Sequence, residues 1–122
     1  MSKKILIADD EETAREYVVY VLQQSGFDPI EASNGTELVE KAKKYKPDLI
    51  MTDILMPGIS GYTAIKKLRV LKICTSTPVI FFSGIMKDKE TFKTLKPDGP
   101  CTFLTKPFDK ELLIAKIKEF LP

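Results

Sequence analysis

The sequence contains no histidine and no tryptophan, and it has only two cysteines. Without histidine, the chain cannot use histidine acid–base catalysis, histidine metal ligands or a phosphocarrier histidine. Cys74 and Cys101 are isolated and lack a Cys-x-x-Cys spacing, so we expect two reduced thiols rather than a disulfide or a metal site. These absences favour a protein of the reducing cytoplasm.

Long hydrophobic runs are also absent. No apolar stretch approaches the roughly 20 residues that a membrane-spanning helix needs. The apolar run at residues 5–8 is too short for the core of a signal peptide and ends in Asp9 and Asp10. We therefore interpret it as a buried strand, and we expect no membrane association.

Length, composition and charge are those of an ordinary globular domain, and they exclude several classes of protein. The chain has 122 residues, of which 43% are hydrophobic and 30% charged, which excludes disorder and a fibrous repeat. We expect one domain over residues 1–122. The 19 basic and 17 acidic residues leave a net charge of +2, so charge gives no reason to expect direct binding to nucleic acid.

The hydrophobic pattern alternates regularly between two periods. Short apolar runs predict strands, and apolar residues three or four positions apart predict helices between them. Such an alternation is typical of an α/β fold with a doubly wound parallel sheet, covered by helices on both faces in three layers. The predicted strands lie at residues 5–8, 27–32, 48–52, 78–82 and 101–105, and the helices near 14–22, 34–45, 65–71, 88–96 and 113–121.

Polar residues follow four of these strands at the point where each strand ends. Asp9 and Asp10 follow the first strand, Asp53 the third, Ser83 the fourth and Lys106 the fifth. Ligands of doubly wound sheets bind at the carboxyl ends of the strands. We therefore expect these side chains to meet at one edge of the sheet.

The chemistry of this group follows from its charges. Three clustered carboxylates repel one another unless a cation lies between them, and hard oxygen ligands favour Mg²⁺ over Zn²⁺. A carboxylate can also act as a nucleophile toward phosphorus, with a metal ion and Lys106 balancing the charge of the phosphoryl oxygens. Asp53 ends the predicted central strand, so it is the candidate for the phosphorylated residue.

Four motifs together resemble the receiver domain of two-component response regulators, the CheY-like family. The resemblance covers essentially the whole chain, in order and at the family's spacing. It implies a flavodoxin-like fold with five helices and a five-stranded parallel sheet in the order 2-1-3-4-5. The motifs are DD at 9–10, DLIMTDILMPGISG at 48–61, PVIFFSG at 78–84 and TKPF at 105–108.

The resemblance also implies a role for the acidic residues. Asp53 would accept a phosphoryl group from a sensor histidine kinase or a phosphotransfer protein. Asp10, Asp53 and the backbone carbonyl of Leu55 would bind Mg²⁺ directly, and Asp9 would act through water.

A second set of roles concerns the phosphoryl group and the switch. Ser83, Gly84 and Lys106 would contact the phosphoryl group, and the bond between Lys106 and Pro107 would be cis. Ser83 and Phe103 would change position on phosphorylation. This would alter the face formed by the fourth helix, fifth strand and fifth helix, to which an unknown downstream protein binds. The chain would be a signalling switch rather than an enzyme, either monomeric or a weak phosphorylation-dependent dimer.

Three features depart from the family's usual pattern. Pro97 and Pro100 should shorten or distort the fourth helix, because proline lacks a backbone donor. Leu55 and Ile85 lie two residues after Asp53 and Ser83, and neither side chain can orient an attacking water, which predicts slow self-dephosphorylation. Phe103 replaces a tyrosine and offers no hydroxyl to a partner.

Three other functions compete with this interpretation. A phosphatase of the haloacid dehalogenase type would need a second aspartate where Leu55 stands, and a flavin carrier would need a glycine-rich loop in place of Asp9 and Asp10. The main alternative is a degenerate receiver that binds proteins independently of phosphorylation. No DNA-binding segment follows Pro122 in this sequence, so we expect a single-domain regulator or the N-terminal part of a larger protein.

Overall fold

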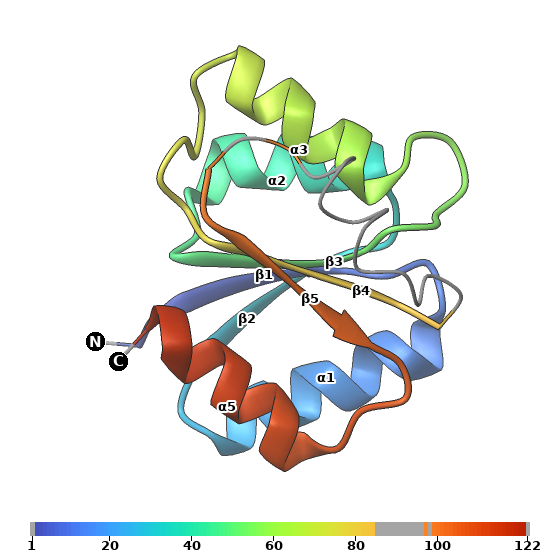
Figure 1. Ribbon diagram of the computed structural model, residues 1–122, viewed down its shortest axis with the longest axis vertical. Helices are drawn as coiled ribbons and strands as arrows, with labels where there is room; N and C mark the ends of the chain where they lie inside the picture. The colour runs from blue at the N-terminus through green and yellow to red at the C-terminus, as the bar shows by residue number, and fades with distance from the viewer. Residues whose placement is uncertain (1, 85–96, 98, 122) are drawn as a thin grey trace.

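The chain folds into a parallel sheet between two layers of helices (Figure 1). The structure is a computed structural model that describes residues 2–84, 97 and 99–121. The strands are β1 (Lys4–Ala8), β2 (Asp28–Ala32), β3 (Leu49–Asp53), β4 (Val79–Ser83) and β5 (Cys101–Thr105), and the helices are α1 (Glu12–Gln24), α2 (Gly35–Tyr45), α3 (Gly61–Val70) and α5 (Lys110–Phe120). The helix expected at 88–96 lies outside the described residues.

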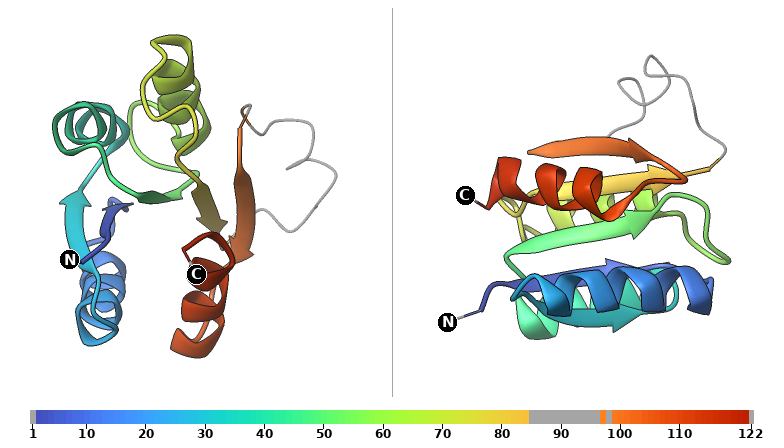
Figure 2. Two further views of the ribbon diagram at one scale, coloured as in Figure 1. Left: turned by 90° about the vertical axis from the view of Figure 1, so that its left-hand side faces the viewer. Right: turned by 90° about the horizontal axis from the view of Figure 1, so that it is seen from below.

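The strand order confirms the predicted fold class. All neighbouring strands are parallel, and their order is β2-β1-β3-β4-β5. The helices α2 and α3 cover one face of the sheet, and α1 and α5 cover the other (Figures 1 and 2). This is the flavodoxin-like, three-layer arrangement that the resemblance implied, with β3 in the centre.

Each face of the sheet carries its own hydrophobic core, because successive strand side chains point to opposite faces. Leu6, Ile50 and Phe81 are fully buried on the face under α2 and α3. Ile5 and Phe82 are fully buried on the other face, under α1 and α5. Burial on both faces explains why the central strands are almost entirely apolar until they end at the polar residues.

The edge strand β2 contains a proline. Pro29 lies within β2, which pairs only with β1 and forms one edge of the sheet. Proline is tolerated there because the missing N–H would face away from the neighbouring strand.

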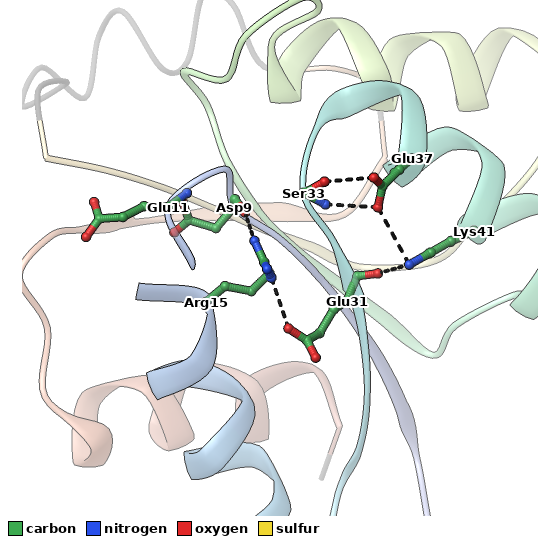
Figure 3. Close-up of polar contacts among 7 residues, drawn as sticks. All are labelled: Asp9, Glu11, Arg15, Glu31, Ser33, Glu37 and Lys41. Atoms are coloured by element: carbon green, nitrogen blue, oxygen red, sulfur yellow. Dashed lines mark hydrogen bonds and ion pairs between the residues drawn. The ribbon is translucent and has the colours of Figure 1, made fainter. Parts of the chain in front are cut away.

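The start of α2 is capped by hydrogen bonds among Ser33, Asn34 and Glu37. The Asn34 side chain does accept a hydrogen bond from the Glu37 N–H at 2.8 Å. The Glu37 carboxylate, however, accepts from the Ser33 N–H and hydroxyl at 3.2 and 2.7 Å (Figure 3). The return bond therefore falls one residue before the cap.

No helix in the described part of the chain is long and apolar enough to cross a membrane.

Pro100 directly precedes β5. Its carbonyl accepts a hydrogen bond from the Val79 N–H at 3.1 Å, which links the start of β5 to β4. The predicted distortion of the fourth helix concerns residues outside those described.

Candidate functional site

Three aspartates meet at the carboxyl edge of the sheet, as their positions in the sequence predicted. One carboxylate oxygen from each of Asp9, Asp10 and Asp53 lies within 4.8 Å of the other two. Asp9 follows β1 and is 1% exposed, Asp53 ends β3 and is half-buried, and Asp10 is exposed. The group thus presents oxygen ligands from a buried base to an open side, which suits a metal ion that keeps several waters.

Lys106 follows the edge strand β5 and pairs with two of these carboxylates. Its Nζ lies 3.0 Å from Asp9 Oδ2 and 3.1 Å from Asp53 Oδ2. It also lies over the Phe82 ring, 5.0 Å from the ring centroid. The ammonium group therefore lies close to Asp53, the carboxylate that the sequence predicts to be the nucleophile.

Burial and charge act in opposite directions on this pair. Burial raises the pKa of the Asp53 carboxyl, and its hydrogen bond with Lys106 offsets that rise only in part. Burial by itself lowers the pKa of Lys106, but hydrogen bonds and charges from Asp9 and Asp53 outweigh it, so the pKa lies above its usual value. The two shifts act in different senses: the raised pKa of Lys106 favours its ammonium form, and the raised pKa of Asp53 shows that Lys106 does not fully offset the cost of burying its carboxylate.

The backbone around Asp9 is held on both sides. Its N–H donates to the Ala32 carbonyl at 3.1 Å, and its carboxylate Oδ1 accepts from the Glu11 N–H at 3.0 Å. The Arg15 Nη1 donates to the Asp9 carbonyl at 2.8 Å, and its Nε donates to Glu31 at 2.9 Å (Figure 3). Arg15 could not be predicted from the sequence, because residue spacing does not show which loop carbonyl an arginine side chain reaches.

The loop after Asp53 packs tightly against the end of β3. The Leu55 N–H donates to Asp53 Oδ1 at 3.3 Å, while the Leu55 side chain is 53% exposed. The Gly61 N–H donates to the Ile54 carbonyl at 2.8 Å. A Cβ at Gly61 would lie 2.3 Å from the Asp53 carbonyl oxygen, so only glycine allows this approach.

The remaining predicted residues lie at the same edge or behind it. Ser83 ends β4 opposite Thr105, but its side chain is outside the described part of the structure. Gly84 follows it and lies near the Lys106 stem, because a Cβ built on Gly84 would be 3.8 Å from that of Lys106. The bond between Lys106 and Pro107 is cis, as the resemblance implied.

Phe103, the predicted switch residue, lies in β5, three residues before Lys106. It is half-buried, pairs with Phe81 across the β4–β5 ladder and packs against the core under α2 and α3. This position is compatible with a packing role as well as with a change of rotamer.

Two hollows flank α1. A cleft of about 470 Å³ lies beside Asp9 and Lys106, with Tyr17, Phe82 and Phe108 among its walls. A larger groove of about 660 Å³ runs between α1 and α5, away from the carboxylates. Chemistry rather than volume therefore identifies the site, and the smaller cleft leads to it.

Comparison with known proteins agrees with this geometry. The response regulator receiver domain family matches residues 5–118. The chain belongs to this family. A receiver domain is a signalling module rather than a conventional enzyme, so the prediction that the chain is not an enzyme is confirmed.

Relatives of this receiver domain differ in length. It is 38% identical over 122 residues to the alkaline phosphatase synthesis transcriptional regulatory protein PhoP of Bacillus subtilis, covering 99% of the chain and 49% of PhoP. It is 36% identical to Protein PilH of Pseudomonas aeruginosa, covering 97% of both proteins. The chain thus spans about half the length of PhoP and nearly all of PilH.

Solved structures share the fold of this receiver domain. The chemotaxis response regulator CheY4 of Vibrio cholerae superposes with a TM-score of 0.87 at 28% identity, over 98% of the chain and 99% of CheY4. The receiver domain of the sensor histidine kinase PA1611 from Pseudomonas aeruginosa, solved with a magnesium ion in its active-site cleft, gives a TM-score of 0.85 at 20% identity, over 99% of the chain and 98% of that domain. At that identity the second comparison supports the fold alone.

Proposed function

We propose that this receiver domain is the phosphorylation-activated switch of a two-component system. It accepts a phosphoryl group on Asp53 from a histidine kinase or phosphotransfer protein, in a reaction that requires Mg²⁺. Phosphorylation then alters the face that includes β5 and α5, to which a downstream protein binds. We further propose that residues 1–122 form one domain and that this domain works in the cytoplasm.

One observation carries this proposal. The Asp53 carboxylate lies at the end of the central strand, 3.1 Å from the Lys106 ammonium and beside the carboxylates of Asp9 and Asp10. A nucleophilic carboxylate, a fixed cation and further oxygen ligands are the parts that phosphoryl transfer needs at one point.

The acidic residues fit a magnesium ion. All three candidate ligands are carboxylates, and one oxygen of each lies within 4.8 Å of the others. Lys106 is the cation that pairs with Asp9 and Asp53, and its single positive charge cannot balance three carboxylates. Asp10 and Asp53, with the Leu55 carbonyl, would hold the ion directly, and Asp9 would act through water. Bound there, Mg²⁺ supplies positive charge against the phosphoryl oxygens.

The residues of the chain then divide the reaction between them. An Asp53 oxygen attacks phosphorus, so that an O–P bond forms while the P–N bond to the donor histidine breaks. Lys106 lies close enough to Asp53 to pair with the transferred group, and Ser83 ends β4 at the same edge, with Gly84 directly after it. The negative charge added to Asp53 draws Ser83 and Lys106 toward it, and Phe103 repacks in response.

A small phosphodonor tests the proposal without a partner protein. Acetyl phosphate with Mg²⁺ should add one phosphoryl group to the chain, as measured by intact-mass spectrometry, and the addition should be lost in Asp53→Asn or with EDTA. Asp28→Asn makes the same chemical change in the exposed first residue of β2 and should be labelled normally.

The degenerate receiver is the alternative outcome of this experiment. Absence of labelling in the unsubstituted chain, with both a small donor and a histidine kinase, would contradict the proposal and favour a phosphorylation-independent binding module.

A further inference from the structure

Arg15 is a charged residue that the proposed chemistry does not use, yet it contacts the backbone of the acidic site. It lies in the first part of α1, and its side chain is only 14% exposed. Such burial of a guanidinium group requires partners. The partners are the Asp9 carbonyl at 2.8 Å and the Glu31 carboxylate at 2.9 Å (Figure 3).

The Asp9 carbonyl belongs to the peptide unit that joins Asp9 to Asp10. Because this unit is planar, fixing its carbonyl also fixes the direction in which the chain enters Asp10. The Asp9 N–H is already bound to the Ala32 carbonyl of β2. Arg15 therefore adds a charge-assisted hydrogen bond to the Asp9 carbonyl, the other backbone polar group of this residue.

The two aspartates differ in how they are held. The Asp9 carboxylate has its own partners, since it accepts bonds from the Glu11 N–H and from Lys106. Among the described residues, the exposed Asp10 carboxylate has no hydrogen bond or ion pair. The position of Asp10 consequently depends on the backbone that precedes it, which is the segment that Arg15 holds.

Glu31 fixes Arg15 in turn. It lies in β2 opposite Ile7, one residue before the β1–β2 pair formed by Ala8 and Ala32. Its carboxylate orients the guanidinium group and offsets a positive charge that would otherwise oppose a cation at the site. The Glu31 carbonyl also accepts a bond from Lys41, which pairs with Glu37 (Figure 3).

We propose that Arg15, oriented by Glu31, is a positioning residue that sets the affinity of the acidic site for Mg²⁺ by fixing the peptide between Asp9 and Asp10. This inference rests on the proposed function, because it assumes that the site binds the ion. It concerns residues that hold ligands rather than residues that contact the ion or the phosphoryl group.

Electrostatics alone predicts the opposite sign, which makes the proposal testable. Removing a cation near three carboxylates should strengthen the binding of another cation. If Arg15 acts by positioning, its removal should instead weaken binding. Residues that orient metal ligands typically contribute about tenfold or more to metal affinity.

The test is calorimetric titration of the unphosphorylated chain with MgCl₂. We expect Arg15→Met to raise the Mg²⁺ dissociation constant by about tenfold, and Glu31→Gln to raise it by a smaller factor. Arg15→Lys, which retains the cation and one donor, should fall between Arg15→Met and the unsubstituted chain. If Arg15→Met fails to fold, Arg15→Lys still decides the matter, because it keeps the positive charge and electrostatics alone then predicts no change in the dissociation constant.

Lys41→Met provides the matched control. It removes one cation from the same network but no contact with Asp9, so its dissociation constant should stay within about twofold of the original or fall slightly. Urea unfolding without metal measures any general loss of stability. With acetyl phosphate, Arg15→Met should need more Mg²⁺ for half-maximal labelling, while the rate at saturating Mg²⁺ is largely restored.

Two results would overturn the inference alone: a dissociation constant in Arg15→Met equal to or lower than that of the unsubstituted chain, or an equal rise in Lys41→Met. Failure of the unsubstituted chain to bind Mg²⁺ would overturn the proposed function as well, so the two failures are distinguishable.

Discussion

At the scale of single residues, the Asp53 carboxylate combines a functional position with an unfavourable environment. Burial raises its pKa, and Lys106 compensates only in part. A carboxyl whose pKa is raised by folding destabilises the folded state at pH values above that pKa, and the effect disappears once the group is protonated. A cation that binds beside the Asp53 carboxylate would offset this loss of folding stability.

The corresponding prediction concerns stability without metal. In EDTA at pH 7, Asp53→Asn should unfold at a higher urea concentration than the unsubstituted chain, because the desolvated charge is gone. The difference should shrink as the pH falls through the pKa of Asp53. A lower urea midpoint for Asp53→Asn under these conditions would contradict this account of the site's electrostatics.

Leu55 determines a second prediction at the residue scale. Its side chain is 53% exposed, beside the acidic site, and it cannot orient a water molecule for attack on the phosphoryl group. Leu55→Asn should shorten the lifetime of phosphorylated Asp53 by roughly an order of magnitude, as followed by loss of the phosphoryl mass after donor removal.

Leu112→Asn is the control for that measurement. Leu112 is a 44% exposed leucine of α5, so the substitution has the same chemistry away from the carboxylates. Equal lifetimes in the unsubstituted chain and Leu55→Asn would show that Leu55 does not limit dephosphorylation. Ile85→Glu is the companion variant at a position outside the described residues.

At the scale of elements, the connection between β3 and α3 fixes the geometry around Asp53. Gly61 begins α3 directly against the Asp53 carbonyl, and Ser60 caps the helix by accepting from the Thr63 N–H. The first turn of α3 therefore lies against the end of the strand that carries Asp53.

Gly61→Ala tests this packing. The new Cβ would lie 2.3 Å from the Asp53 carbonyl oxygen, which can move only if the backbone of β3 shifts. We therefore expect the free energy of unfolding to fall by about 2–3 kcal/mol. Gly84→Ala is the stability control, because the nearest atom of the described residues would lie 3.8 Å from its Cβ. Equal urea midpoints for Gly61→Ala and the unsubstituted chain would mean that the two elements are not tightly joined.

The sequence predicted the elements well because burial dictates their pattern. The strand predicted at 101–105 matches β5, and those predicted at 48–52 and 78–82 are each displaced by one residue from β3 and β4. The displacement has a simple cause: the ladder extends to the polar residues Asp53 and Ser83, which hydrophobicity alone excludes.

Contacts between elements were harder to predict. Asp9, Asp53 and Lys106 could be grouped because parallel strands end at one edge. Arg15 and Glu31 could not be grouped, since an arginine side chain can reach many carbonyls and only the packing of α1 against β2 selects one. The Glu37 bond to Ser33 likewise depends on the local path of the chain before α2.

At the scale of the whole molecule, a hydrophobic core lies on each face of the sheet, and the candidate site residues lie at its carboxyl edge. The fold and family follow from the pattern and are shared with proteins as different in length as PhoP and PilH. The proposed function as a switch therefore rests on the set of side chains at that edge, with Asp53 as the proposed acceptor.

The most direct test of that central claim is chemical mapping of the phosphorylated residue. The chain is phosphorylated with acetyl phosphate and Mg²⁺ and reduced with borohydride, which converts an aspartyl phosphate to homoserine, and the converted position is then read by tandem mass spectrometry. The account predicts homoserine at position 53. Homoserine at position 9 or 10 instead, or at no position, would contradict it.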